Sequence, residues 1–125
     1  MTNSEKKHLL QDMRARCNPN AFNKLKKDEV DEKCRVIIHD ISKLFEKIDL
    51  LDGDYLAHTD GKGNRPNELL ANGLTNVSLE RCGTIITFFL REDRWASLDL
   101  DDFPFRDRIL KGDVYKVLAR MCDLL

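Results

Sequence analysis

The chain has 125 residues, of which 42% are hydrophobic, and its 21 lysines and arginines against 22 aspartates and glutamates leave a net charge of −1. This length suits a single domain, residues 1–125, with a core large enough to fold without disulfides or a metal. The balanced charge argues against a nucleic-acid binder and against an electrostatic membrane partner. The longest apolar run is far too short to span a membrane.

The N-terminal half of the sequence predicts three helices. The first covers about residues 3–17, and Pro19 can begin a short second one because proline is favoured at the first helical position. The clearest helix covers about residues 28–50, where apolar residues recur at spacings of three and four. Its apolar stripe consists of Val30, Cys34, Ile37, Ile38, Ile41, Leu44, Phe45 and Ile48.

The stretch from Asp52 to Arg65 is rich in glycine and charge and predicts a loop. A short helix should follow it and end at Gly73. Ser78 is a plausible N-cap for the next helix, whose buried face ends at Leu90. Its glycine and its two β-branched threonines lower helix propensity, so a buried strand over residues 84–90 is the rival interpretation. The helical spacing of the apolar residues and the cap favour a helix.

After an acidic turn at residues 98–102, two further helices are predicted, over about residues 103–111 and from Asp113 to the end of the chain. No convincing strand and no internal repeat is found. The pattern therefore predicts an all-α protein, a compact bundle of about five or six helices.

The four cysteines predict the cellular compartment. Three of them fall on apolar faces of predicted helices, where cysteine acts as a small hydrophobic residue. The N-terminus, MTNSEKKHLL, lacks the apolar run and cleavage site of a secretory signal. We therefore expect reduced thiols and a cytoplasmic location.

The segment Val77–Leu125 resembles the C-terminal part of a family of uncharacterised bacterial proteins, a domain of unknown function. The resemblance is carried by SLE at residues 78–80, IITFF at 85–89, REDRW at 91–95 and an amphipathic helix at the end. The segment REDRW departs from the family pattern at its second, third and fifth positions. The resemblance implies a bacterial protein with a helical fold, and it implies no activity.

The strongest candidate site in the sequence is the turn expected at Arg91, Asp93, Arg94 and Trp95. Two guanidinium groups beside an aromatic ring can clamp a phosphate or a carboxylate, because arginine offers a planar fork of donors. The alternative is structural: arginines near a helix C-terminus bind the last carbonyls and interact favourably with the helix dipole.

A second group of polar residues surrounds the predicted loop and consists of Asp49, Asp52, Asp54, His58 and Asp60. Carboxylates of this kind can bind a hard cation, but their spacing does not follow the calcium-loop pattern. The glycine-rich turn at residues 60–64 lacks the strand and helix of a phosphate-binding P-loop, and the cysteines and histidines are too scattered for zinc. The sequence therefore predicts no metal, no cofactor and a solvated loop.

The sequence favours a binding protein over an enzyme and offers no catalytic residue. We expect a small helical domain that acts through protein–protein interaction, either with a protein partner or by self-association as a homodimer. Trp95 and the arginines would anchor the interface, and Phe103 and Phe105 could extend it. The alternative is a small-anion- or nucleotide-linked enzyme or sensor that combines Arg91 and Arg94 with the loop. A pocket between that loop and these arginines would favour the alternative.

Overall fold

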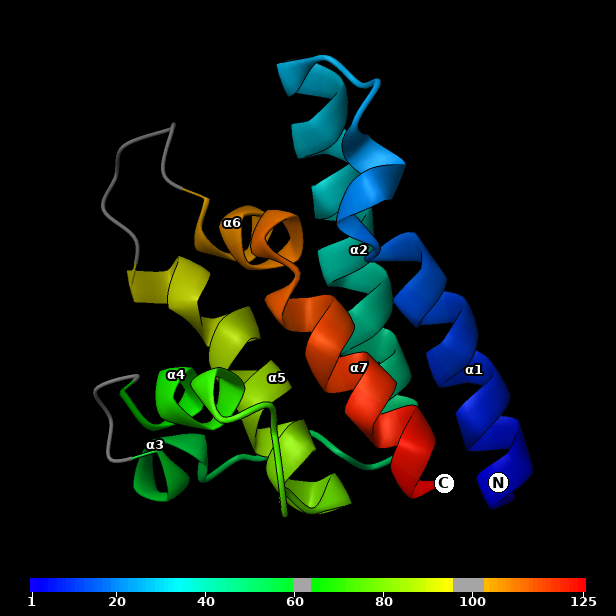
Figure 1. Ribbon diagram of the computed structural model, residues 1–125, viewed down its shortest axis with the longest axis vertical. Helices are drawn as coiled ribbons and strands as arrows, with labels where there is room; N and C mark the ends of the chain where they lie inside the picture. The colour runs from blue at the N-terminus through cyan, green and yellow to red at the C-terminus, as the bar shows by residue number, and fades with distance from the viewer. Residues whose placement is uncertain (60–63, 96–102) are drawn as a thin grey trace.

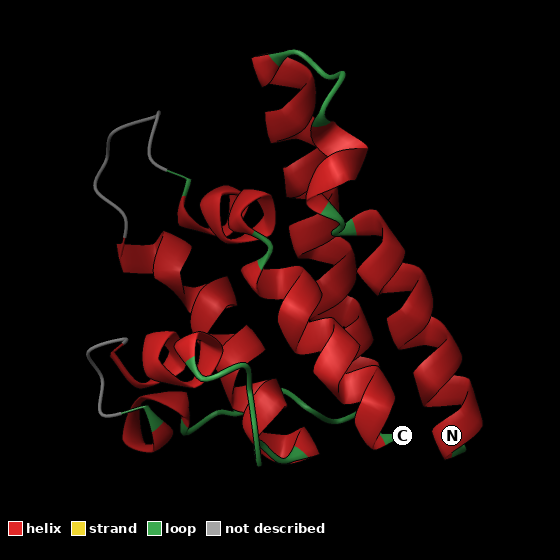
Figure 2. Cartoon of the chain, in the orientation of Figure 1, coloured by secondary structure: helices red, strands yellow, loops and turns green. Residues whose placement is uncertain are grey.

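The computed structural model describes residues 1–59, 64–95 and 103–125. Within these ranges the chain forms seven α-helices and one 3-10 turn (Figure 1), and Figure 2 shows no strand among them. The all-α prediction is confirmed, with one helix more than the upper number expected. The acidic turn predicted at residues 98–102 lies outside the described ranges. The helices are α1 (Asn3–Arg16), α2 (Lys27–Lys47), α3 (Tyr55–His58), α4 (Asn64–Ala71), α5 (Leu79–Trp95), α6 (Pro104–Lys111) and α7 (Asp113–Leu124), and the 3-10 turn is η1 (Pro19–Phe22).

Local side chains set the ends of several helices. The hydroxyl of Ser78 accepts a hydrogen bond from the backbone N–H of Arg81 at 3.1 Å, which confirms the predicted cap of α5. Thr2 caps α1 in the same way and accepts from the N–H of Glu5 at 3.1 Å. Between α6 and α7, Gly112 adopts a φ of 87°, a left-handed conformation that glycine reaches at little cost.

Helix α7 lies at the centre of the helix packing. Helices α1, α2 and α7 lie side by side, with both chain termini at the same end (Figure 1). Helix α7 packs against α1 on one side and against α5 on the other, while α6 contacts α2, α5 and α7. The shared core contains large, fully buried apolar side chains from each of these helices: Leu10, Ile37, Ile41, Phe45, Ile85, Ile86, Phe89, Phe105, Ile109, Val114, Leu118 and Met121.

Helix α5 is the buried helix of the fold. Every residue from Cys82 to Leu90 is buried, as expected for a helix that is apolar on all sides. The hydroxyl of Thr87 donates to the carbonyl of Gly83 at 2.7 Å, one turn earlier, which satisfies a polar group inside the helix. The rival strand over residues 84–90 is therefore wrong. The helix also continues through Trp95, so residues 91–95 form its last turn rather than a separate turn.

The aromatic residues at the start of α6 belong largely to the core. Phe105 is 0% exposed and packs in the shared core. Phe103 is half-buried, and the guanidinium groups of Arg35 and Arg106 lie 5.9 and 5.6 Å from the centre of its ring. The expectation that both rings extend an exposed interface is wrong for Phe105, because its side chain fills the space between helices.

Candidate functional site

The candidate site lies where the chain leaves α2 and packs against α5. Asp49 adopts a φ of 59°, which turns the chain away from the helix, and the N–H of Leu50 donates to the carbonyl of Phe45 at 2.9 Å. The carbonyl of Leu50 then lies directly against Gly83, so closely that a side-chain carbon on this glycine would overlap the oxygen. The glycine in α5 is therefore what allows this loop to approach the helix.

Asp52 is the centre of a small hydrogen-bond network. Its Oδ2 accepts from the hydroxyl of Thr84 at 2.6 Å and lies 2.5 Å from Nδ1 of His58. Its Oδ1 accepts from the N–H of Asp54 at 2.9 Å, and its own N–H donates to the hydroxyl of Thr87 at 3.0 Å. The network holds the loop, α3 and the middle of α5 together.

The network also determines the charge of Asp52. Burial by itself raises the pKa of this carboxyl, but the hydrogen bonds from Thr84, His58 and the Asp54 N–H outweigh it, so that the pKa lies below its ordinary value. Asp52 is therefore a carboxylate at neutral pH, already supplied with donors on both oxygens. It acts as a fixed structural anion rather than as a free proton acceptor.

His58 ends α3 and borders a pocket at the surface. Its side chain is 47% exposed, whereas that of Asp52 is 17% exposed, and its backbone carbonyl accepts from Nη1 of Arg81 at 3.2 Å. The ring of Tyr55, at the other end of α3, packs edge-on against Phe88 with 6.3 Å between ring centres. These contacts fix α3 against α5 and orient His58 by its Nδ1.

The pocket has a volume of about 320 Å³ and is formed by the chain that follows α2, by His58 and by the first turns of α5. Leu50 and Leu51 contribute apolar surface, and Arg81 is the arginine that faces the loop. The exposed acidic residues Asp49 and Glu80 also line the pocket. Within the described part of the chain, neither of these two has an ion-pair or hydrogen-bond partner. Two carboxylates without a described partner therefore lie beside apolar surface at this pocket, together with Arg81, whose guanidinium donates to a neutral backbone carbonyl.

The predicted site at the end of α5 lies elsewhere. Arg91 is half-buried and is not among the residues that line the pocket. The backbone of Asp93, Arg94 and Trp95 belongs to the last turn of α5, and their side chains lie outside the described part of the structure. The prediction that these residues bind a partner stays a prediction.

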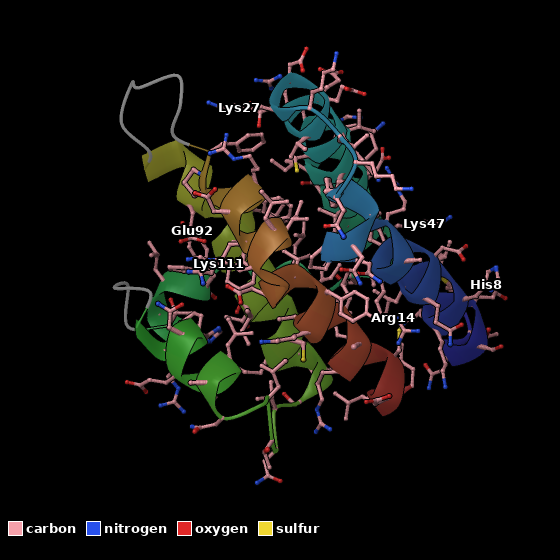
Figure 3. All side chains as sticks on the ribbon, turned by 45° about the horizontal axis from the view of Figure 1, so that its top comes forward. His8, Arg14, Lys27, Lys47, Glu92 and Lys111 are labelled. Atoms are coloured by element: carbon pink, nitrogen blue, oxygen red, sulfur yellow. The ribbon has the colours of Figure 1, made fainter. Side chains whose placement is uncertain are left out.

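The neighbouring residue Glu92, labelled in Figure 3, has a structural role that the sequence did not reveal. Its two oxygens accept from Nε and Nη2 of Arg108 at 2.9 and 3.2 Å. The same guanidinium donates to Asp113 at 3.1 Å and to Asn67 at 2.8 Å, and it lies 4.5 Å from the centre of the Phe89 ring. Burial lowers the pKa of Arg108, but its two carboxylate partners outweigh burial and raise it above its ordinary value. This network ties α4, α5, α6 and α7 together.

Metal and thiol chemistry find little support in the described residues. No group of three or more histidine, cysteine or carboxylate side chains within them is placed to hold a metal ion. His58 pairs with Asp52, and Asp60, its expected neighbour, lies outside the described residues. All four cysteines are free and buried. Burial raises the pKa of Cys17 and of Cys82 to about 12 and that of Cys34 to about 11, and it raises that of Cys122 as well, so these thiols are poor nucleophiles.

The chain matches no family model, and no curated protein and no solved structure shows significant similarity to it. The resemblance of Val77–Leu125 to a family of uncharacterised bacterial proteins therefore stays a prediction. Among the described helices, none combines the length and the apolar character needed to cross a bilayer.

Proposed function

We propose that this chain acts by binding another protein and that the pocket beside the start of α5 receives a lysine or arginine side chain of that partner. The observation that carries the proposal is that two acidic residues without a described partner, Asp49 and Glu80, line the same pocket as the apolar side chains of Leu50 and Leu51. A long basic side chain has an apolar stem and a charged end, so it matches both features at once.

The rigid wall of the pocket supports recognition rather than catalysis. Asp52 is held by Thr84 and His58 and cannot readily change its geometry when a ligand binds. A site that is already ordered loses less conformational entropy on binding. Leu56, on the same short helix as His58, is 44% exposed and offers apolar contact area outside the pocket. A bacterial cytoplasmic location is part of the proposal, and the four free, buried thiols support its cytoplasmic part.

The experiment is the selection of a random peptide library on the immobilised protein. We expect wild type to enrich peptides that contain lysine or arginine, and we expect the double variant Asp49→Lys/Glu80→Lys to lose this enrichment. The matched control is Glu68→Lys/Asp123→Lys, which makes the same change of charge at two exposed positions outside the pocket.

Titration of the best peptide then measures the effect. The pocket variant should raise the dissociation constant at least about tenfold, the equivalent of one favourable charged contact, and the control should bind like wild type. If wild type enriches no peptide, or if both variants bind the selected peptide equally well, the proposed role of the pocket is wrong.

A second candidate function is a sensor or enzyme for a small anion or a nucleotide. The observation that favours it is the pair of His58 and Asp52 beside Arg81, because a carboxylate that holds one ring nitrogen of a histidine leaves the other nitrogen oriented for proton transfer. The arginine at this pocket is Arg81 and not the pair expected at the end of α5. Titration with inorganic phosphate and with nucleotides, on wild type and on Arg81→Gln, tests this candidate, and wild type without affinity for either probe would exclude it.

A further inference from the structure

A groove runs along the outer side of α1 and α2, away from the pocket beside α5. It consists of two adjoining hollows of about 500 and 290 Å³ that share Leu9 and Lys47. The larger hollow opens at Met1, and the smaller one ends at the ion pair between Arg16 and Asp40, whose atoms lie 2.8 Å apart. The groove exists because α1 packs mainly against α7 and makes few contacts with α2.

The groove has an apolar floor. Leu9 and Leu44 are half-buried, and Met13 is buried and belongs to the core. Met1, at the open end, is 52% exposed and is the most exposed large hydrophobic residue of the described chain. If a partner covers this apolar surface, each Å² removed from water contributes about 25 cal/mol of favourable binding free energy.

The two walls of the groove carry opposite charges. The wall from α1 contributes Glu5 and Asp12, and the wall from α2 contributes Lys43 and Lys47. Arg16 of α1 and Asp40 of α2 also line the smaller hollow, but they neutralise each other in their ion pair. The two helices run antiparallel (Figure 1), so Glu5 and Lys47 border one hollow while Asp12 and Lys43 border the next. Lys47 and the α1 residue His8 lie on the same side of the molecule in Figure 3.

These lysines are available for an outside partner. Among the described residues, neither Lys43 nor Lys47 has an ion-pair or hydrogen-bond partner, and the same holds for the side chain of Glu5. Asp12 lies 3.6 Å from His8 in a pair whose side chains are 69% and 74% exposed. Exposed pairs of this kind contribute little to stability and can be exchanged for a contact with another molecule.

We infer that a second copy of this chain docks groove to groove on this face and forms a homodimer with two-fold symmetry. A two-fold axis that runs along the groove places α1 of one copy over α2 of the other. Glu5 then faces Lys47 of the second copy and Asp12 faces its Lys43, and the symmetry repeats each contact. The face is therefore complementary to itself in charge, as the interface of a two-fold dimer must be. The inference is independent of the pocket proposed above.

The experiment is sedimentation equilibrium at low salt with two charge-reversal variants. One is Glu5→Lys/Asp12→Lys, and the other is Lys43→Glu/Lys47→Glu. Wild type should have the mass of two chains, and each variant alone should have the mass of one, because its two walls then carry the same charge. An equimolar mixture of the two variants should regain the mass of two chains, since each variant supplies the charge that the other lacks. We expect the dissociation constant of each single variant to exceed that of the mixture by at least about a hundredfold.

The control Glu68→Lys/Asp123→Lys changes exposed charges elsewhere and should leave the dimer intact, and far-ultraviolet circular dichroism should show that all variants stay helical. Wild type with the mass of one chain at millimolar concentration would overturn the inference. A mixture of the two variants that fails to associate would overturn it as well, because it would show that the pairing of the walls does not hold the copies together.

Discussion

The replacement of Arg108 by methionine tests the network that ties α5 to α6 and α7. Methionine keeps much of the length and apolar surface of the side chain and removes its charge. The side chain of Arg108 is 13% exposed, and those of its partners Glu92 and Asp113 are 20% and 15% exposed. The substitution therefore leaves two carboxylates in a mostly buried place without a counter-charge.

The expected loss of unfolding free energy comes from these two carboxylates, which the substitution leaves without a counter-charge. Removal of one partner from a buried ion pair costs about 3–5 kcal/mol, and since both acids keep some access to water the low end, about 3 kcal/mol, applies here. For a chain of 125 residues, 1 kcal/mol corresponds to about 4 °C in melting temperature. We therefore expect Arg108→Met to melt about 12 °C below wild type.

Thermal and urea unfolding, followed by circular dichroism, measure this loss. The matched control is Arg35→Met: Arg35 lies 3.8 Å from Glu32 in a pair whose side chains are 62% and 72% exposed, and its loss should cost less than about 0.5 kcal/mol. A triple variant that adds Glu92→Gln and Asp113→Asn should recover part of the loss, because it removes the uncompensated charges. If Arg108→Met is no less stable than Arg35→Met, the reasoning from buried charge is wrong.

Two further predictions concern the contact between the loop and α5. Asp52 has a folded-state pKa below its ordinary value of 3.8, so it stabilises the fold above about pH 3.8 and this contribution is lost as the pH falls through the folded-state pKa. In Asp52→Asn the unfolding free energy should therefore fall less steeply as the pH is lowered into the acid range. A fall as steep as that of wild type would contradict the role of the Asp52 hydrogen bonds. Gly83→Ala should destabilise the protein by about 2 kcal/mol despite alanine's higher helix propensity, because its methyl group overlaps the Leu50 carbonyl. Gly53→Ala, where a Cβ has no neighbour within 4 Å, is the control, and equal melting temperatures for the two variants would contradict the close approach.

The sequence was informative about α5 because helix signals are local. Its apolar spacing and the Ser78 cap predicted a helix, and both are confirmed. The buried face ends at Leu90 as predicted, but residues 91–95 continue the helix, whereas their charge had suggested a separate turn. In this last turn the carboxylate of Glu92 accepts from Arg108, which lies 16 residues further along the chain. A contact of this separation leaves no periodic signal in the sequence.

The candidate site, too, could be predicted from the sequence only in part. The sequence singled out Asp52 and His58 as members of an acidic loop but gave no reason to pair them, and in the structure His58 contacts Asp52. Thr84 and Thr87 entered only as residues of low helix propensity, whereas in the structure their hydroxyls hold the loop. Their role depends on a loop 32 or more residues earlier in the chain lying against α5, and sequence spacing carries no information about that approach.

The sequence by itself determined the all-α class, the apolar faces of the long helices and the cap of α5, because each of these depends on residues three or four positions apart. It also placed three of the four cysteines on apolar helix faces. The tertiary structure alone decided that the pocket forms around Arg81, that Arg108 joins four helices, and that α1 and α2 leave a groove with oppositely charged walls. These features arise where segments distant in sequence meet, and the free energy of such contacts depends on packing geometry that no local pattern specifies.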